Sequence, residues 1–345
     1  MIKILQGDAL AKLKEIDDGS INTCVTSPPY WGLRDYGQED QLGLEETPEE
    51  FIDNMVAVFS EVKRCLRDDG TLWLNMGDSY AMSYTRGGNK EFKGDIGSHK
   101  HWGKEGSIKL GKRNLPFNLK QKNLIGMPWR LALALQADGW YLRQDIIWHK
   151  PNPMPESVRD RCTKAHEYIF LLSKKPKYYY DHEAIKEDAK YPQGPNSPQS
   201  IKKGKGMYGM DTRGGLSNVG ALAKKNKRSV WTVTTKPFKG AHFATFPQDL
   251  IEPCILAGCP EKICVDCGTP YKREMQKTGE FQRRWSKTIA TAEGSPHEGQ
   301  SSMQNIYEDL GFKKQCDCQT NATKIGTVLD PFAGSGTTGL VANNH

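Results

Sequence analysis

A serine, two successive prolines and a tyrosine stand together at Ser27, Pro28, Pro29 and Tyr30. They follow the apolar run from Ile21 to Thr26, which has the composition of a buried strand. Two prolines fix φ near about −65° and remove two backbone donors, so this segment is expected to project rigidly from the strand end with its carbonyl oxygens outward. The alternative is a proline-stiffened turn with an incidental aromatic residue.

A second segment with chemical potential covers residues 330–339, Asp-Pro-Phe-Ala-Gly-Ser-Gly-Thr-Thr-Gly. It places a carboxylate at the end of a short strand and glycines in the turn before a helix. Glycines let the backbone approach a ligand closely, and a helix N-terminus offers free N–H groups. A Walker A loop requires a lysine after its last glycine, whereas Gly336 is followed by Thr337, so binding of a triphosphate is disfavoured.

Four cysteines form a candidate metal site. Cys264 and Cys267 have the C-x-x-C-G spacing of a zinc knuckle, and Cys316 and Cys318 follow as a C-x-C pair. Together they offer four thiolates, enough for a closed tetrahedral zinc site. The alternative is a set of unliganded thiols in a reducing compartment.

The first two segments resemble the motifs of a known enzyme family. Thr26-Ser27-Pro28-Pro29-Tyr30-Trp31 is similar to the catalytic motif of the DNA aminomethyltransferases, and residues 330–339 resemble their S-adenosylmethionine loop. The order of the two motifs resembles the permuted, or β, class, which phages and restriction systems often encode. The resemblance implies a Rossmann-like, doubly wound α/β fold. It also implies methyl transfer from S-adenosylmethionine to an exocyclic nitrogen of cytosine or adenine in double-stranded DNA.

The resemblance also implies a role for each motif residue. An exocyclic amine is a poor nucleophile, so acceptors must hold its protons and leave the nitrogen lone pair facing the sulfonium methyl. Ser27 Oγ and the Pro28 carbonyl are the expected acceptors, Pro29 stiffens the loop, and Tyr30 is expected to stack on the flipped base, with Trp31 as a candidate second wall. The expected cofactor-binding residues of the second motif are Asp330, Phe332, Gly334, Gly336 and Thr337.

Further stretches resemble family motifs. Gly7-Asp8-Ala9-Leu10 is similar to the motif whose carboxylate contacts the cofactor adenine, although Asp8 also fits a helix N-cap and both roles can hold. Residues 242–247, which include Phe246, resemble a cofactor-side motif. Residues 147–153 and 164–170 also resemble stretches found in this family.

The elements that must position these motifs alternate between strands and helices. Thr47-Pro48-Glu49-Glu50 predicts a capped helix start, and Asp69-Gly70 predicts its end. Strands are expected at residues 2–6, 21–26, 71–75, 142–149, 167–172 and 326–330, and helices at 9–16, after 47, at 127–137 and after 247. This alternation predicts a mostly parallel, doubly wound sheet.

The intervals between these elements predict the domain organisation. Lys and Arg outnumber Asp and Glu in residues 78–122 and 201–240, and aromatic residues are scattered through the first interval. Such composition suits a phosphate backbone and unstacked bases, whereas the alternative is a solvated surface. We expect 1–77 as the catalytic half, 78–122 as a basic insertion near the active site, 123–182 as the continuation of the sheet, 183–240 as the target-recognition region, 241–259 with 326–345 as the cofactor half, and 260–325 as a zinc-knuckle insertion.

Charge and composition bound the remaining possibilities. The 345 residues carry a formal net charge of +7, so the uneven distribution of charge, more than its total, indicates a nucleic-acid partner. The apolar run at the N-terminus is too short for a signal peptide, and no later run is long enough to span a bilayer. We therefore expect a cytoplasmic protein without a membrane partner, acting on double-stranded DNA, with a restriction endonuclease as a candidate counterpart.

Two alternatives stay open at this point. Ser27 favours cytosine N4, because adenine-N6 enzymes more often carry Asp or Asn there, but adenine N6 is the alternative target. The family's next strand, with an acidic residue for the cofactor ribose, is expected after the helix begun at Gly336, where the sequence stops at His345. The chain is therefore expected to be a fragment or to bind cofactor poorly, and a DNA-binding scaffold without activity is the competing class of function.

Overall fold

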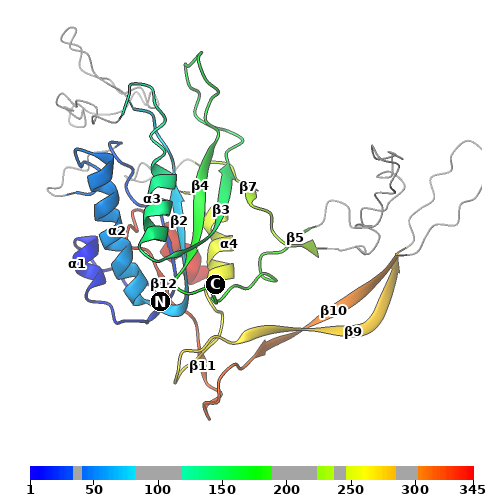
Figure 1. Cartoon of the computed structure of the whole chain (residues 1–345). Helices are drawn as coiled ribbons and strands as arrows, with labels where there is room; N and C mark the ends of the chain where they lie inside the picture. Colours follow the sequence, from blue (N-terminus) through cyan, green and yellow to red (C-terminus); the bar gives the residue numbers. More distant parts are fainter. Residues whose placement is uncertain (34–40, 82–118, 189–223, 237–245, 285–301) are drawn as a thin grey trace, which may run out of the picture. The chain divides into compact units, whose positions relative to one another are not determined.

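The computed structural model describes residues 1–33, 41–81, 119–188, 224–236, 246–284 and 302–345. These residues form two compact units (Figure 1). Unit 1 contains Met1–Tyr180, Arg228–Pro260 and Ile325–His345, and unit 2 contains Asp181–Lys227 and Glu261–Lys324. Most of the two basic intervals, all but Tyr80 of the aromatic residues of the first, and residues 242–245 of the cofactor-side motif lie outside the described residues.

Unit 1 is built on a six-stranded sheet in the order β12-β1-β2-β4-β3-β7. β1 is parallel to both β12 and β2, β3 is parallel to β7, and β4 is antiparallel to β2 and β3. Only β4 among these six strands therefore runs against the others, and the predicted mostly parallel sheet is confirmed. The strands are β1 Ile21–Thr26, β2 Leu66–Met76, β3 Tyr141–His149, β4 His166–Ser173, β7 Val230–Thr232 and β12 Val328–Leu329.

Helices cover both faces of this sheet (Figure 1). On one face, α1 (Ala9–Leu13) and α3 (Met127–Ala137) both pack against α2 (Pro48–Cys65). On the other face, α4 (Gln248–Gly258) and α5 (Thr337–Asn344) contact each other, α4 lies against β1 and β2, and α5 lies against β12. The Rossmann-like, doubly wound α/β fold implied by the sequence is confirmed.

Alternating side chains of β2 separate the two helical layers. Leu72 and Leu74 are fully buried in the core cluster that includes Phe51 of α2 and Leu131 of α3. Trp73, between them, is also buried but faces α4, where a Cβ added to Gly258 would come within 2.6 Å of its indole nitrogen. A period of two along the strand thus supplies apolar side chains to both faces, as a doubly wound sheet requires.

Helix α2 begins as the sequence predicts and ends earlier. The Thr47 hydroxyl accepts from Glu50 N at 3.2 Å, and the Glu50 carboxylate accepts from Thr47 N at 3.2 Å, so the capping box is complete. The predicted end at Asp69-Gly70 is wrong, because the helix stops at Cys65 and β2 starts at the next residue. Asp69 and Gly70 lie in the register shift where β2 gains extra residues relative to β1, so these turn-forming residues bend a strand.

One strand prediction is wrong, and one strand of the main sheet was not predicted. Residues 2–6 are exposed and pair with no strand among the described residues, although their apolar pattern predicts one. A strand exists through its hydrogen-bonded partner, which a local pattern does not reveal. Conversely, β7 lies within the interval expected to recognise the target, and it was not predicted because three residues are too short for periodicity; its pairing with β3 defines it.

The described residues of unit 2 form three antiparallel strand pairs. β5 (Glu187–Asp188) pairs with β6 (Lys224–Lys225), and β8 (Ile263–Cys264) pairs with β11 (Thr323–Lys324). β9 (Lys272–Arg284) and β10 (Ser302–Lys313) form a long two-stranded ribbon (Figure 1). At the base of this ribbon Arg273 forms ion pairs with Asp181 at 3.0 Å and with Asp309 at 2.6 Å, which join three segments of the unit.

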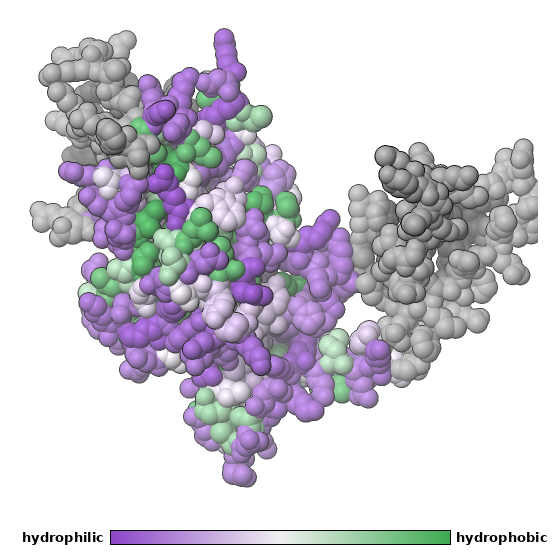
Figure 2. Space-filling model, in the orientation of Figure 1, coloured by the Kyte–Doolittle hydropathy of each residue, from purple (hydrophilic) through white to green (hydrophobic). Residues whose placement is uncertain are grey.

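The surface is largely hydrophilic on the face drawn in Figure 2. Apolar surface occurs over α3, where Trp129 is 38% exposed and Leu133 is 52% exposed. Within the described residues, no helix combines the length and the apolar character needed to cross a membrane.

Candidate active site

The two motifs meet at one edge of the sheet in unit 1. Because β12, β1 and β2 are parallel neighbours, their carboxyl ends lie side by side. Asp330 follows β12, Ser27 follows β1, and Gly77 follows β2. Thr26, the residue before Ser27, donates its hydroxyl hydrogen to Asp330 Oδ1 at 2.6 Å. One hydrogen bond therefore connects the base of the proline loop (residues 27–30) directly to the glycine-rich segment (residues 330–339).

Tyr30 is held by a charged pair from the adjoining strands. Its hydroxyl donates to Glu167 Oε2 at 2.8 Å, and the other carboxylate oxygen of Glu167 forms an ion pair with Lys150. Glu167 belongs to β4, and Lys150 follows the last residue of β3. These residues lie in stretches that resemble family sequences, but their approach to Tyr30 depends on the pairing of β3 with β4, which the sequence does not specify.

The environment of Tyr30 keeps its phenol protonated. Burial raises the pKa of Tyr30 well above its usual value, and the nearby Glu167 carboxylate raises it further. Hydrogen bonds from the Ser27 side chain and the Gly77 backbone act in the opposite direction and are weaker. Tyr30 therefore acts as a neutral hydrogen-bond donor with its ring held at this edge of the sheet.

Gly77 makes the close approach of Tyr30 and Glu167 feasible. A Cβ at this position would lie 2.9 Å from Tyr30 Cε2 and 3.1 Å from Glu167 Cδ. Sequence reasoning missed Gly77, and the available signal was a glycine placed directly after a buried strand.

The expected second wall at Trp31 is not formed. Trp31 is only 9% exposed, belongs to the core cluster of unit 1, and donates its indole N–H to the Glu45 carbonyl at 3.0 Å. An aromatic residue beside a strand end can either stack on a base or pack in the core, and the Trp31 side chain packs in the core.

Asp330 organises the glycine-rich segment. Its Oδ1 accepts from the Thr26 hydroxyl and, at 3.1 Å, from Phe332 N, and its Oδ2 accepts from the Thr338 hydroxyl at 2.7 Å. Burial raises the pKa of Asp330, and these hydrogen bonds partly oppose that shift. The carboxylate thus joins the end of β12, the end of β1 and the start of α5.

The other residues of this segment have distinct surroundings. Gly334 and Gly336 adopt φ of 50° and 76°, in the left-handed region that favours glycine, and nothing lies within 4 Å of a Cβ added to Gly336. The Thr337 hydroxyl lies 3.0 Å from Ser335 Oγ. The Phe332 ring packs edge-on against Phe59 of α2, with the ring centroids 6.4 Å apart, so it anchors the turn to the core.

The two remaining cofactor candidates lie beside helix starts. Asp8 is the N-cap of α1, where its Oδ1 accepts from Ala11 N at 2.8 Å, as the capping alternative predicts. Phe246 is partly buried and stands just before Pro247, the N-cap residue of α4. Contact of either residue with a cofactor remains a prediction.

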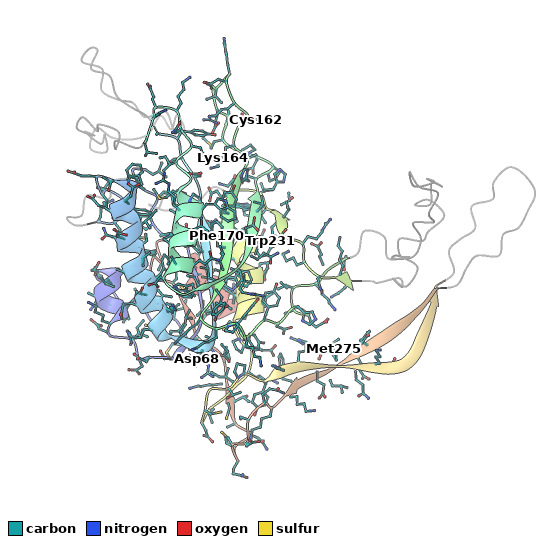
Figure 3. All side chains as sticks on the ribbon, in the orientation of Figure 1. Asp68, Cys162, Lys164, Phe170, Trp231 and Met275 are labelled. Carbon is teal, nitrogen blue, oxygen red and sulfur yellow. The ribbon has the colours of Figure 1, made fainter. Side chains whose placement is uncertain are left out.

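A lysine joins the segment before β4 to the residue that follows the end of β2. Lys164 Nζ donates to the Asp78 carbonyl at 3.1 Å, and burial lowers the pKa of Lys164, opposed by the charges of Asp78 and Glu167. Figure 3 shows Lys164 beyond the end of the sheet in which Phe170 lies. Asp78 also accepts from Gly126 N and Met127 N, at 3.0 and 3.1 Å, and so fixes the start of α3 at the same edge.

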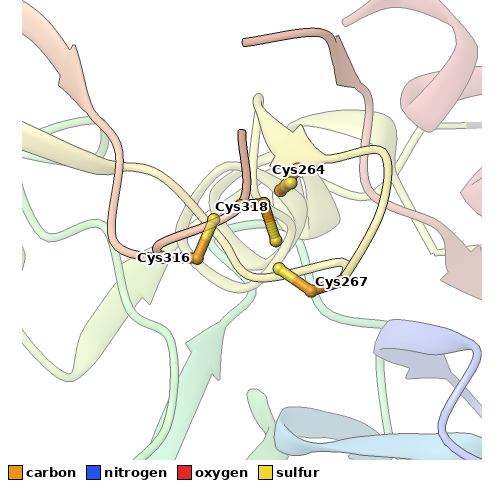
Figure 4. A group of neighbouring side chains, drawn as sticks. All are labelled: Cys264, Cys267, Cys316 and Cys318. Carbon is orange, nitrogen blue, oxygen red and sulfur yellow. The ribbon is translucent and has the colours of Figure 1, made fainter. Parts of the chain in front are cut away.

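In unit 2 the structure brings Cys264, Cys267, Cys316 and Cys318 together (Figure 4), with all four sulfur atoms within 4.8 Å of one another. Tetrahedral zinc with Zn–S bonds of about 2.3 Å needs sulfur atoms about 3.8 Å apart, so the donor set fits zinc after a small contraction. Hydrogen bonding to the Thr269 hydroxyl lowers the pKa of Cys267 to about 6, while hydrogen bonding to Cys267 raises that of Cys318 to about 12.

Comparison with known proteins identifies the family. Residues 21–267 match the N6/N4 methyltransferase family, described as DNA methylase. The chain belongs to this family. The match contains the proline loop of this methylase and ends at Cys267, while the glycine-rich segment lies beyond it.

Two similar curated relatives are Type II methyltransferases. The methylase is 47% identical to M.Cfr9I of Citrobacter freundii over 254 residues, which cover 74% of this chain and 71% of the relative. It is 48% identical to M.SmaI of Serratia marcescens over 256 residues, which cover 74% of this chain and 75% of the relative.

Two solved structures are more distantly similar to this methylase. The PvuII cytosine-N4-specific DNA methyltransferase has a TM-score of 0.45 at 17% identity, covering 74% of this chain and 70% of that chain. The M1.HpyAVI complex with S-adenosylmethionine has a TM-score of 0.43 at 12% identity, covering 100% of this chain and 88% of that chain.

Proposed function

We propose that this methylase transfers a methyl group from S-adenosylmethionine to the exocyclic N4 of cytosine in duplex DNA. The observation that carries the proposal is the hydrogen bond between Thr26 and Asp330, at 2.6 Å, because it joins the base of the proline loop to the glycine-rich turn. A methyl donor held by one segment and an amine held by the other would then lie at neighbouring strand ends.

The proline loop would orient the amine. The Ser27 hydroxyl and the Pro28 carbonyl would accept the two amine hydrogens, Pro29 would limit movement of the loop, and the Tyr30 ring would stack on the flipped base. The nitrogen lone pair then faces the methyl group, a C–N bond forms as the C–S bond breaks, and the methylated nitrogen loses a proton. Acceptors that are already oriented stabilise the positive charge that develops on nitrogen.

The glycine-rich turn would hold the methyl donor. Left-handed φ values at Gly334 and Gly336, with open space beside Gly336, leave the backbone accessible to a ligand. The first N–H groups of α5, from Thr337 onward, have no acceptor within the helix and are free to meet the donor's polar groups. Asp330 and Phe332 would hold this turn in its conformation, and Asp8 and Phe246 would contact the adenine part of the methyl donor. S-adenosylmethionine supplies a sulfonium methyl group when bound.

The choice of cytosine rests on Ser27, the residue type that favours N4 over N6 in enzymes of this kind. The buried Trp31 contributes nothing to the choice, so an argument from pocket width no longer supports a pyrimidine. Adenine N6 is the alternative target.

Mass spectrometry of nucleosides from methylated DNA tests the reaction and the base together. The protein is incubated with S-adenosylmethionine and unmethylated genomic DNA, and we expect N4-methylcytosine as the product. N6-methyladenine alone would overturn the base and leave the reaction standing, whereas no methylated base across varied DNA would favour a scaffold that binds DNA without activity.

The DNA sequence that the methylase recognises would be read by residues 183–240. This interval lies between the two motifs in the sequence and is rich in Lys and Arg from 201 to 240. By analogy with the Type II methyltransferases it resembles, the methylase would protect host DNA from a restriction endonuclease specific for the same site.

We also propose that Cys264, Cys267, Cys316 and Cys318 bind one structural zinc ion in unit 2. The support is the cluster of four sulfur atoms within 4.8 Å. Four protein ligands leave no open coordination position, so zinc would stabilise the fold of unit 2 and take no part in methyl transfer.

A further inference from the structure

The hydroxyl of Tyr30 has an ionic partner that the proposed reaction does not use. Glu167 gives one carboxylate oxygen to the Tyr30 hydroxyl, at 2.8 Å, and the other to Lys150. The Glu167 and Lys150 side chains are only 18% and 19% exposed. A pair this sheltered from solvent is held more firmly than a surface ion pair, so the three groups form a defined network.

The sheet fixes the position of this network. Trp148 of β3 pairs with Glu167 of β4, and beyond β3 the Lys150 N–H donates to the Ala165 carbonyl at 2.8 Å. The Lys150 ammonium lies 4.2 Å from the centre of the Trp148 ring, so a cation–π contact restrains the lysine from a second side. Glu167 and Lys150 therefore stand on paired backbone, whereas Tyr30 stands on a loop.

A loop tyrosine benefits from such an anchor. Stacking on a base requires a defined ring plane, and a hydrogen bond at the far end of the ring restricts its tilt. The absence of a side chain at Gly77 leaves room for this arrangement, because an added Cβ would lie 2.9 Å from Tyr30 Cε2 and 3.1 Å from Glu167 Cδ.

We propose that Glu167 is a positioning residue for methyl transfer: held by Lys150, it fixes the Tyr30 ring in the plane on which the target base stacks. This inference rests on the proposed function, because it assigns Tyr30 to the flipped base. It adds Glu167, Lys150 and Gly77 to the residues on which the reaction depends, although none of them touches the base.

A double-mutant cycle in single-turnover methyl transfer tests the inference. With DNA and S-adenosylmethionine saturating, we expect Tyr30→Phe and Glu167→Ala each to slow transfer by about tenfold, the effect of one lost hydrogen bond to a charged group. The double variant should be no slower than the slower single variant, because both changes remove the same hydrogen bond. Glu167→Gln, whose amide oxygen still accepts from the phenol, should recover most of the rate.

Gly77→Ala provides a test that deletes no functional group. The added methyl group would displace Tyr30 or Glu167, so we expect slower transfer with the affinity for S-adenosylmethionine unchanged. Gly70→Ala is the matched control in the first half of β2, away from Tyr30, where the added Cβ would meet the Arg67 carbonyl at 2.9 Å. It should lower thermal stability and leave the rate constant intact.

Glu61→Gln is a second control, because Glu61 forms an ion pair of similar exposure with Arg64 on α2, away from the proline loop. Equal rate losses in Gly70→Ala and Gly77→Ala, additive losses in the cycle, or a Tyr30→Phe variant at the parental rate would overturn the inference and leave the proposed function intact. A parental protein that transfers no methyl group would overturn the proposed function, and the inference would fall with it.

Discussion

Asp330 shows how one side chain can set the geometry of two motifs. Its carboxylate accepts from Thr26 on one side and from Thr338 and Phe332 N on the other. Burial nevertheless raises its pKa, so desolvation outweighs the three hydrogen bonds. The charged form of Asp330 is thus less favourable for folding than the protonated form. Its role is to hold the ends of β12 and β1 and the start of α5 together through its hydrogen bonds.

The raised pKa of Asp330 predicts a pH dependence of stability. The folded chain holds the Asp330 proton more tightly than the unfolded chain, in which the pKa of an aspartate is about 3.9. The contribution of Asp330 to stability therefore falls as the pH rises from that unfolded-state pKa to the higher pKa of the folded state. In Asp330→Asn the group is neutral throughout, and the Thr338 hydroxyl can accept from the amide while it donates to the Val25 carbonyl at 3.2 Å. Urea unfolding of both proteins at several pH values should show the parental protein losing stability relative to the variant as the pH increases. If the free energies of unfolding of the two proteins changed with pH in parallel, the raised pKa of Asp330 would be contradicted.

Ser27→Ala should separate methyl transfer from cofactor binding. The lost hydroxyl is an acceptor for the amine, so we expect transfer to slow by about 100-fold, as when other preorganised polar contacts to a transition state are removed. The affinity for S-adenosylmethionine, measured by calorimetry, should change little. Ser20→Ala is the matched control, since Ser20 precedes β1 and donates to the Asp17 carbonyl at 2.7 Å. A fully active Ser27→Ala variant would remove Ser27 from the reaction.

Residue types alone located part of this site. Ser27 and Asp330 stand beside prolines and glycines whose backbone restrictions are visible in a sequence, and the structure brings them to one edge. Glu167 and Lys150 have no such local signal, because their meeting with Tyr30 depends on the register of β3 and β4. For Trp31 the local signal is misleading: its position beside the motif predicts a second wall for the flipped base, whereas its burial shows that it packs in the core.

At the scale of elements, patterns longer than about ten residues predict the structure well. The α3 helix occupies the predicted range Met127–Ala137, and α2 starts at its predicted cap. Short elements depend on partners far along the chain: β7 is defined by β3, and residues 2–6 lack a partner strand among the described residues. Periodicity therefore predicts which segments have a strand or helix pattern, and pairing decides which of them become strands.

The capping box of α2 offers a test at this scale. Thr47→Ala removes the acceptor for Glu50 N, so we expect a loss of about 1 kcal/mol in the free energy of unfolding. α2 carries Phe51 and Phe59 into the core, so the loss should appear in the main unfolding transition. Thr47→Ser keeps the hydroxyl and should stay close to the parental stability. A serine variant as unstable as the alanine variant would assign the effect to the threonine methyl group.

At the scale of the whole molecule, unit 2 is assembled from two excursions of the chain. Asp181–Lys227 leaves unit 1 after Tyr180, and Glu261–Lys324 leaves it after Pro260. All four clustered cysteines belong to the second excursion, whereas the proline loop and the glycine-rich turn belong to unit 1. The two candidate sites are thus in separately packed parts of the chain, so loss of metal and loss of catalysis need not accompany each other.

Zinc removal should therefore affect unit 2 and spare unit 1. Elemental analysis is expected to find about one zinc per chain, absent from Cys264→Ser and Cys316→Ser, because a closed site loses affinity with any one of its four thiolates. Cys162→Ser is the matched control, since Cys162 is an exposed cysteine outside the cluster. After treatment with a chelator, proteolysis should cut within residues 261–324, while S-adenosylmethionine still binds unit 1 with the parental affinity. Metal-free protein with four freely alkylated thiols would exclude the zinc site, and equal zinc loss in Cys162→Ser would exclude this set of ligands.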